Sequence, residues 1–131
     1  MIALDTNIVV RHLAQDDARQ SALATRLIEQ QLTKTNRGLV SLGALLETGW
    51  VMESAYGAEE WTVAGIVVDL LDSAVLEVQE GAAVADAISR YQKGGVDLHD
   101  CLIVSLAERR GAKTLTFDRK ASRRLGMELL R

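Results

Sequence analysis

The stretch Ile2-Ala3-Leu4-Asp5-Thr6-Asn7-Ile8-Val9-Val10-Arg11-His12-Leu13 decides the fold of this chain. Its first three apolar residues favour a short strand, and Asp5, Thr6 and Asn7 are residue types that begin helices. The apolar residues that follow predict a helix. The stretch is therefore one βα unit, the building block of a parallel sheet.

The same alternation continues along the chain. Further strands are predicted at 39–41, 75–78 and 113–117, with an edge strand at 127–130. Helices are predicted from apolar side chains spaced three and four residues apart, at roughly 17–34, 42–52, 58–71, 82–91, 98–110 and 120–125. Alternating strands and helices indicate a parallel sheet with helices on both faces. We therefore expect a three-layer α/β/α fold around a central parallel sheet of four to five strands.

Length and composition fit one domain over residues 1–131. Apolar residues make up 48% of the chain and charged residues 25%, which is typical of a globular protein. The sequence contains no proline, no linker-like tract and no internal repeat. No stretch has the length and apolar character of a membrane span, and none resembles a signal peptide. We therefore expect a cytoplasmic protein with no membrane partner.

Four carboxylates are candidates for a shared site. Asp5 and Asp118 each follow a predicted strand, and Asp100 lies at the start of the helix before the fourth strand. In a parallel sheet, the ends of the strands and the starts of such helices meet at one edge, where ligands bind. Glu47 lies about five residues into the helix after the second strand, within reach of that edge. Its apolar neighbours predict a carboxylate embedded in the protein, which needs a partner.

Each acidic residue also has a purely structural explanation. Asp5 and Asp118 are suited to cap the helices that follow them, and Asp97 with Asp100 fits a helix cap followed by an acidic residue in the first turn. The functional interpretation depends on all four residues meeting at one edge.

Carboxylates that meet must hold protons or bind a cation, because two of them 4 Å apart repel by about 4 kcal/mol at an effective dielectric constant near 20. Oxygen ligands favour Mg²⁺ or Mn²⁺, and His12 and His99 lack the spacing of a zinc site. A metal-bound water attacks phosphodiesters. The single cysteine, Cys101, lies in an apolar helix and fits a buried hydrophobic residue better than a nucleophile.

The net charge is −3, but basic residues are concentrated near the end of the chain. Such a region can bind phosphates even on an acidic protein, or it can be a solvated helix surface. We expect RNA-backbone contacts from Arg119, Lys120, Arg123 and Arg124.

The sequence resembles the PIN-domain ribonucleases of the VapC toxin type. The resemblance covers essentially the whole chain and rests on the order and spacing of four features: Met1-Ile2-Ala3-Leu4-Asp5-Thr6-Asn7, the isolated Glu47, Asp97-Leu98-His99-Asp100-Cys101-Leu102-Ile103, and Leu115-Thr116-Phe117-Asp118-Arg119-Lys120. It implies a PIN-like fold and a metal-dependent endoribonuclease, held inactive by an antitoxin encoded beside it.

The resemblance also implies roles for individual residues. Asp5 and Asp100 match the metal-binding positions, Glu47 the helical acid, and Asp118 a more variable fourth acid, so that all four are candidate catalytic residues. Supporting polar positions match Thr6, Asn7 and Thr116, and Asp97 is a rival for the third acid. The family usually forms homodimers, and residues 41–56 with the following apolar helix are the candidate contact region.

Two other functions remain open from the sequence. The first is a magnesium-dependent phosphatase with Asp5 as nucleophile, although such an enzyme favours a second carboxylate at the position of Asn7. The second is a noncatalytic RNA-binding or regulatory domain, which predicts phosphate contacts without metal-dependent cleavage.

Overall fold

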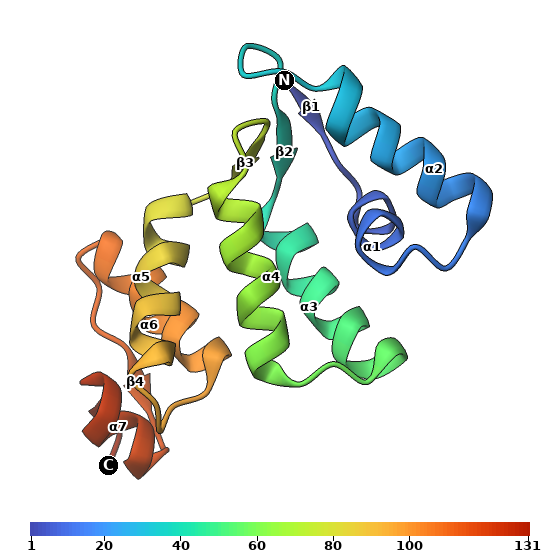
Figure 1. The fold of residues 1–131 in the computed structure, drawn as a ribbon. Helices are drawn as coiled ribbons and strands as arrows, with labels where there is room; N and C mark the ends of the chain where they lie inside the picture. Colours follow the sequence, from blue (N-terminus) through green and yellow to red (C-terminus); the bar gives the residue numbers. More distant parts are fainter. The chain divides into compact units, whose positions relative to one another are not determined.

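Strands and helices alternate along the chain in the computed structural model, which describes all residues 1–131 (Figure 1). The contacts between residues divide the chain into two units, Met1–Gln79 and Glu80–Arg131. No helix combines the length and the apolar character needed to cross a membrane.

The first unit contains three short strands and the helices that connect them. In chain order these are β1 (Ile2–Ala3), α1 (Thr6–Ala14), α2 (Ala18–Arg26) with a π-helical turn (Leu27–Gln31), β2 (Gly38–Val40), α3 (Leu42–Tyr56), α4 (Glu60–Asp72) and β3 (Leu76–Val78). The strands form a parallel sheet in the order β1-β2-β3. Helices α1 and α2 connect β1 to β2, and α3 and α4 connect β2 to β3, as Figure 1 shows.

Tight packing around β2 explains the glycine at position 38. Gly38 is paired with Ile2 on one side and with Leu76 on the other. A methyl group on this residue would lie 2.8 Å from Leu32 Cδ1 and 3.0 Å from Leu76 Cδ2. The missing side chain therefore lets leucines close over the strand and bury the centre of the sheet.

The helices of this unit begin where short polar side chains accept backbone hydrogen bonds. The Asp17 carboxylate accepts from the backbone N–H of Gln20 at 2.7 Å and so caps α2. Ser41 was predicted as the last residue of a strand, but β2 ends at Val40 and the Ser41 hydroxyl caps α3 by accepting from Ala44 N at 3.1 Å. The cap competes with strand pairing for this residue.

The second unit is a helix pair followed by a small parallel sheet. Its elements are α5 (Gly81–Gln92), α6 (Leu98–Arg109), β4 (Leu115–Thr116), α7 (Arg119–Leu125) and β5 (Glu128–Leu129), with β4 and β5 paired in parallel. Val84 and Ala87 of α5 and Cys101 of α6 are fully buried, so the cysteine is the small core residue that was predicted. Their small side chains let the two helices approach closely.

The α/β class and the parallel strands are confirmed. The five strands form a three-stranded parallel sheet in the first unit and a two-stranded parallel sheet in the second. The strands are also short: β4 covers Leu115–Thr116, whereas the apolar pattern predicted 113–117. Apolar pattern predicts strand character residue by residue, but a strand extends only as far as its partner supplies hydrogen bonds.

Candidate active site

The first predicted acid lies where β1 leads into α1. Asp5 is the N-cap of α1, and its Oδ1 accepts a hydrogen bond from Thr6 N at 2.8 Å. Thr6 is buried, whereas Asp5 and Asn7 are exposed. Only one carboxylate oxygen is used by the cap, so Oδ2 keeps its capacity to bind a ligand at the end of a parallel strand.

Glu47 shares a cavity with Asp5. The cavity has a volume of ≈ 310 Å³ and is lined by residues of α1 and α3, among them Asp5, Thr6, Asn7, Arg11, Glu47 and Tyr56. The structure thus brings two of the predicted acids together within the first unit. The prediction that Glu47 is embedded was wrong, because its side chain is exposed. The neighbouring side chains of Leu45 and Thr48 are buried, and Glu47 lies on another side of the helix.

A polar network at this cavity had no signal in the sequence. Arg11 Nη1 lies 3.1 Å from Asp16 Oδ1, and the Tyr56 hydroxyl donates a hydrogen bond to Asp16 Oδ2 at 2.6 Å. The hydrogen bond from Tyr56 is the main reason why the pKa of Asp16 lies below its usual value. The network joins the start of α2 to the end of α3, forty residues apart. No local pattern predicts contacts at that separation.

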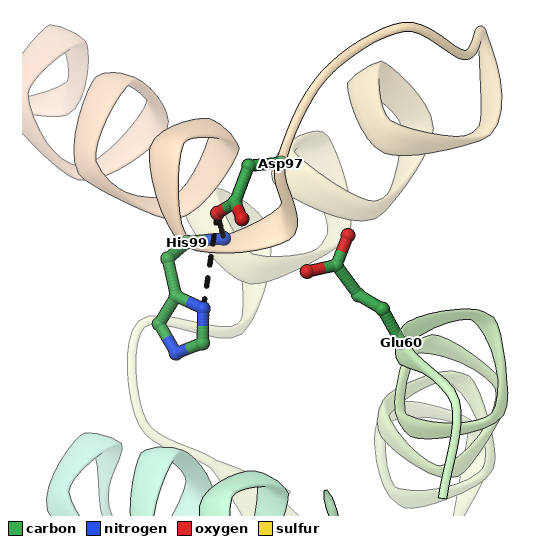
Figure 2. Close-up of side chains that lie close together, drawn as sticks. All are labelled: Glu60, Asp97 and His99. Atoms are coloured by element: carbon green, nitrogen blue, oxygen red, sulfur yellow. Dashed lines mark hydrogen bonds and ion pairs between the residues drawn. The ribbon is translucent and has the colours of Figure 1, made fainter.

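Two further predicted residues, Asp97 and Asp100, lie at the start of α6, and Figure 2 shows Asp97 beside His99. Asp97 caps the helix by accepting from His99 N at 2.8 Å and from Asp100 N at 3.2 Å, and the same oxygen lies 3.8 Å from His99 Nδ1. The third side chain drawn in Figure 2, Glu60, belongs to the first residue of α4 in the other unit. Asp97 is therefore the helix cap, and Asp100 follows it in the first turn.

Asp118 follows β4 and begins α7. Its Oδ1 accepts hydrogen bonds from Lys120 N at 2.8 Å and Ala121 N at 3.0 Å. Its own backbone N–H donates to Thr116 Oγ1 at 3.0 Å, so the threonine side chain stabilises the turn between β4 and α7. Asp118 thus has the predicted structural role of a cap, which leaves Oδ2 without a hydrogen bond.

The carboxylates of the second unit interact with one another. The pKa of Asp100 lies above its usual value, mainly because the residue is partly buried and also because the negative charges of Asp97 and Asp118 disfavour its ionised form. His99 counteracts this effect only in part. The arrangement offers oxygen ligands and an excess of negative charge, which is the chemistry that suits Mg²⁺ or Mn²⁺.

The structure therefore places the four predicted acids in two groups. Asp5 and Glu47 line one cavity of the first unit, and Asp100 and Asp118 interact within the second. Within each unit the predicted residues are neighbours, although they come from different helices. The meeting of the two groups stays a prediction.

Comparison with protein families identifies the class of the protein. The family model of the PIN domain matches residues 2–125 and so runs through both units. The chain belongs to the PIN domain family. PIN domains are generally nucleases that act on RNA, and they typically use divalent metals. Among curated proteins, no sequence matches the chain.

Proposed function

We propose that this protein is a Mg²⁺- or Mn²⁺-dependent endoribonuclease and the toxin of a VapC-type toxin–antitoxin pair. The observation that carries the proposal is the group of three neighbouring carboxylates at the starts of α6 and α7, in a chain that belongs to a nuclease family. Such a group is unfavourable in an empty site and favourable around a cation. A cap role alone requires only Asp97 and Asp118.

The proposed roles follow the chemistry of the side chains. Asp5 and Asp100 would hold the metal ion, with Glu47 and Asp118 as further catalytic acids. When bound, the ion lowers the pKa of a coordinated water and neutralises charge on the phosphate. The proposal takes residues 1–131 as one PIN domain, which the extent of the family match supports.

The supporting residues orient the acids. Thr6 N holds one oxygen of Asp5, and Thr116 Oγ1 accepts from the backbone of Asp118. Asp97 fixes the first turn of α6 and so sets the direction of Asp100. Asn7 is exposed in the cavity that Asp5 and Glu47 line, where its amide can donate to a phosphate oxygen.

Exposed aromatic residues support the proposed protein partners. Trp50 on α3 is 65% exposed and Trp61 on α4 is 70% exposed, and Leu46 and Tyr56 on α3 are also exposed. Exposed apolar side chains of this size are frequent at protein interfaces. We infer that this surface forms a homodimer contact, that the cognate antitoxin binds the toxin in the cytoplasm, and that no membrane is involved.

Digestion of RNA tests the proposal. The purified protein should cut total RNA with Mn²⁺ and stop when EDTA is added, and end mapping should show internal cleavage. Asp5→Asn and Asp100→Asn should both abolish cleavage. The matched control is Asp69→Asn, which removes one exposed carboxylate from α4 outside both groups.

Binding without cleavage would decide against the nuclease. If the wild-type protein binds RNA but leaves it intact with Mn²⁺ and with Mg²⁺, the noncatalytic alternative replaces the proposal. Cleavage that persists in Asp5→Asn or Asp100→Asn would remove that residue from the metal site. In bacteria, expression of the wild-type chain should arrest growth and expression of Asp100→Asn should not.

A further inference from the structure

A second cavity lies within the unit that carries Asp100 and Asp118. It has a volume of ≈ 410 Å³ and lies between the end of α5, the loop that follows it, and α7. Its lining consists of Asp86, Ser89, Arg90, Lys93, Gly94, Val96, Arg124 and Leu125. Three of the four charged side chains are cations, so the cavity favours an anion.

Two of the charged residues compensate each other. Arg90 Nε lies 3.0 Å from Asp86 Oδ2, which also accepts a hydrogen bond from Ser105 Oγ at 2.8 Å. Arg90 pairs in addition with Glu108. The pKa of Asp86 is lowered, first by the Ser105 hydrogen bond, so its charge is present at neutral pH and remains bound to Arg90. This network supports the cavity wall.

The other two cations have no partner within the protein. Neither Lys93 Nζ nor the Arg124 guanidinium forms an ion pair, although both side chains face the same cavity. Both residues are exposed, so their charges are available to a ligand. Together they supply two positive charges and several N–H donors to one cavity.

The guanidinium of Arg124 lies against Gly95. A methyl group on Gly95 would lie 3.3 Å from Cζ and from Nη1 of Arg124, so the guanidinium lies directly against the glycine backbone. Gly94 and Gly95 both have positive φ angles, +86° and +77°, which a side chain would disfavour. The loop therefore brings its backbone close to Arg124, and a side chain at position 95 would crowd the guanidinium.

Two short segments of the chain connect this cavity to the carboxylates of Asp97, Asp100 and Asp118. The loop that lines it continues from Val96 directly into Asp97, the cap of α6. Arg124 lies on α7, whose cap is Asp118, six residues or roughly 9 Å along the helix. A nucleic acid chain held at the acids can extend over this distance along α7.

We propose that the cavity lined by Lys93 and Arg124 binds a backbone phosphate of the RNA strand, one that is not cleaved. The inference rests on the proposed function, because it takes RNA as the substrate. It narrows the basic region to two residues: Arg124 from the predicted cluster and Lys93, which the sequence did not single out. Arg119, Lys120 and Arg123 line no part of this cavity.

The experiment measures RNA binding separately from cleavage. Fluorescence anisotropy of a labelled single-stranded RNA oligonucleotide is followed in EDTA over a range of salt concentrations, and cleavage by the same proteins is followed with Mn²⁺. Lys93→Ala/Arg124→Ala should weaken binding on the order of tenfold for unrelated sequences and reduce the salt slope by roughly one to two. Lys34→Ala/Arg110→Ala removes the same charges elsewhere and should leave both quantities unchanged.

A charge-preserving variant excludes a folding defect. Lys93→Arg/Arg124→Lys keeps both cations in the cavity and should retain the wild-type salt slope, while thermal melts check that all variants fold. If the double alanine variant binds RNA as tightly as the control variant, the phosphate site is wrong and the proposed nuclease function still stands. If the double alanine substitution weakens RNA binding but the wild-type protein does not cut RNA, the result supports the phosphate site and contradicts the proposed nuclease function. Wild-type protein that does not bind RNA contradicts both.

Discussion

Asp100→Asn should make the metal-free protein more stable while it abolishes catalysis. Partial burial is the main reason why the pKa of Asp100 is raised, and repulsion by Asp97 and Asp118 raises it further. The amide keeps the shape of the side chain and removes its charge. Because the folded state disfavours the ionised form, the penalty is complete at pH 7, above both the folded and the unfolded pKa.

The size of the effect follows from two opposing contributions. Relief from two partly solvated like charges returns about 1 to 2 kcal/mol. Loss of a negative charge in the first turn of α6 costs about 0.3–1 kcal/mol, because that charge interacts favourably with the helix dipole. The net gain is about 1 kcal/mol, which raises the melting temperature of a domain of this size by roughly 4 °C.

Thermal melts in EDTA at pH 7 and near pH 4 provide the assay. The advantage of the variant should shrink as the pH falls through the raised pKa of Asp100 toward the unfolded value of about 3.9. Millimolar Mg²⁺ should reverse the ranking, because it stabilises only the protein that binds it. Asp97→Ala is the matched control and should melt lower in both conditions, because it removes a helix cap.

One outcome would refute the reasoning. If Asp100→Asn melts lower than wild type in EDTA at pH 7, with no response to pH, the residue stabilises the first turn of α6 and repulsion is unimportant. Retained RNA cleavage in the same variant would further exclude Asp100 as a metal ligand.

Three other predictions follow from the packing, the buried polar network and the exposed aromatic residues. Gly38→Ala should destabilise the protein by about 1–3 kcal/mol in urea unfolding, because the added methyl overlaps leucine side chains; an unchanged midpoint would show that they move aside without cost. Ser105→Ala should cost about 0.5–1 kcal/mol at pH 7. The difference from wild type should narrow as the pH falls from the unfolded value of about 3.9 through the lowered folded-state pKa of Asp86, and a pH-independent difference would assign the loss to packing. Trp50→Ala/Trp61→Ala should convert a dimer to a monomer in sedimentation velocity, and a dimer that persists would place the interface elsewhere.

Features that depend on neighbouring residues were predictable from the sequence. The caps at Asp17, Asp97 and Asp118 form within three residues of the side chain that provides them. The order of strands and helices follows from apolar spacing that repeats over single elements. The parallel pairing of the strands was also predictable, because two neighbouring strands joined through a helix run in the same direction. The family resemblance then assigned chemistry to residues that local rules describe only as caps.

Features that depend on distant residues required the tertiary structure. The exposure of Glu47 depends on which side of α3 packs inward, and the division into two sheets depends on which strands find partners. The Tyr56–Asp16 hydrogen bond and the contact of Arg124 with Gly95 join segments that no local pattern connects. The sequence determined the elements, the caps and the acidic residues, because those arise from short-range hydrogen bonds and periodicity. Folding decided which side chains share a cavity and which charges remain unpaired, because both depend on contacts between elements far apart in the chain.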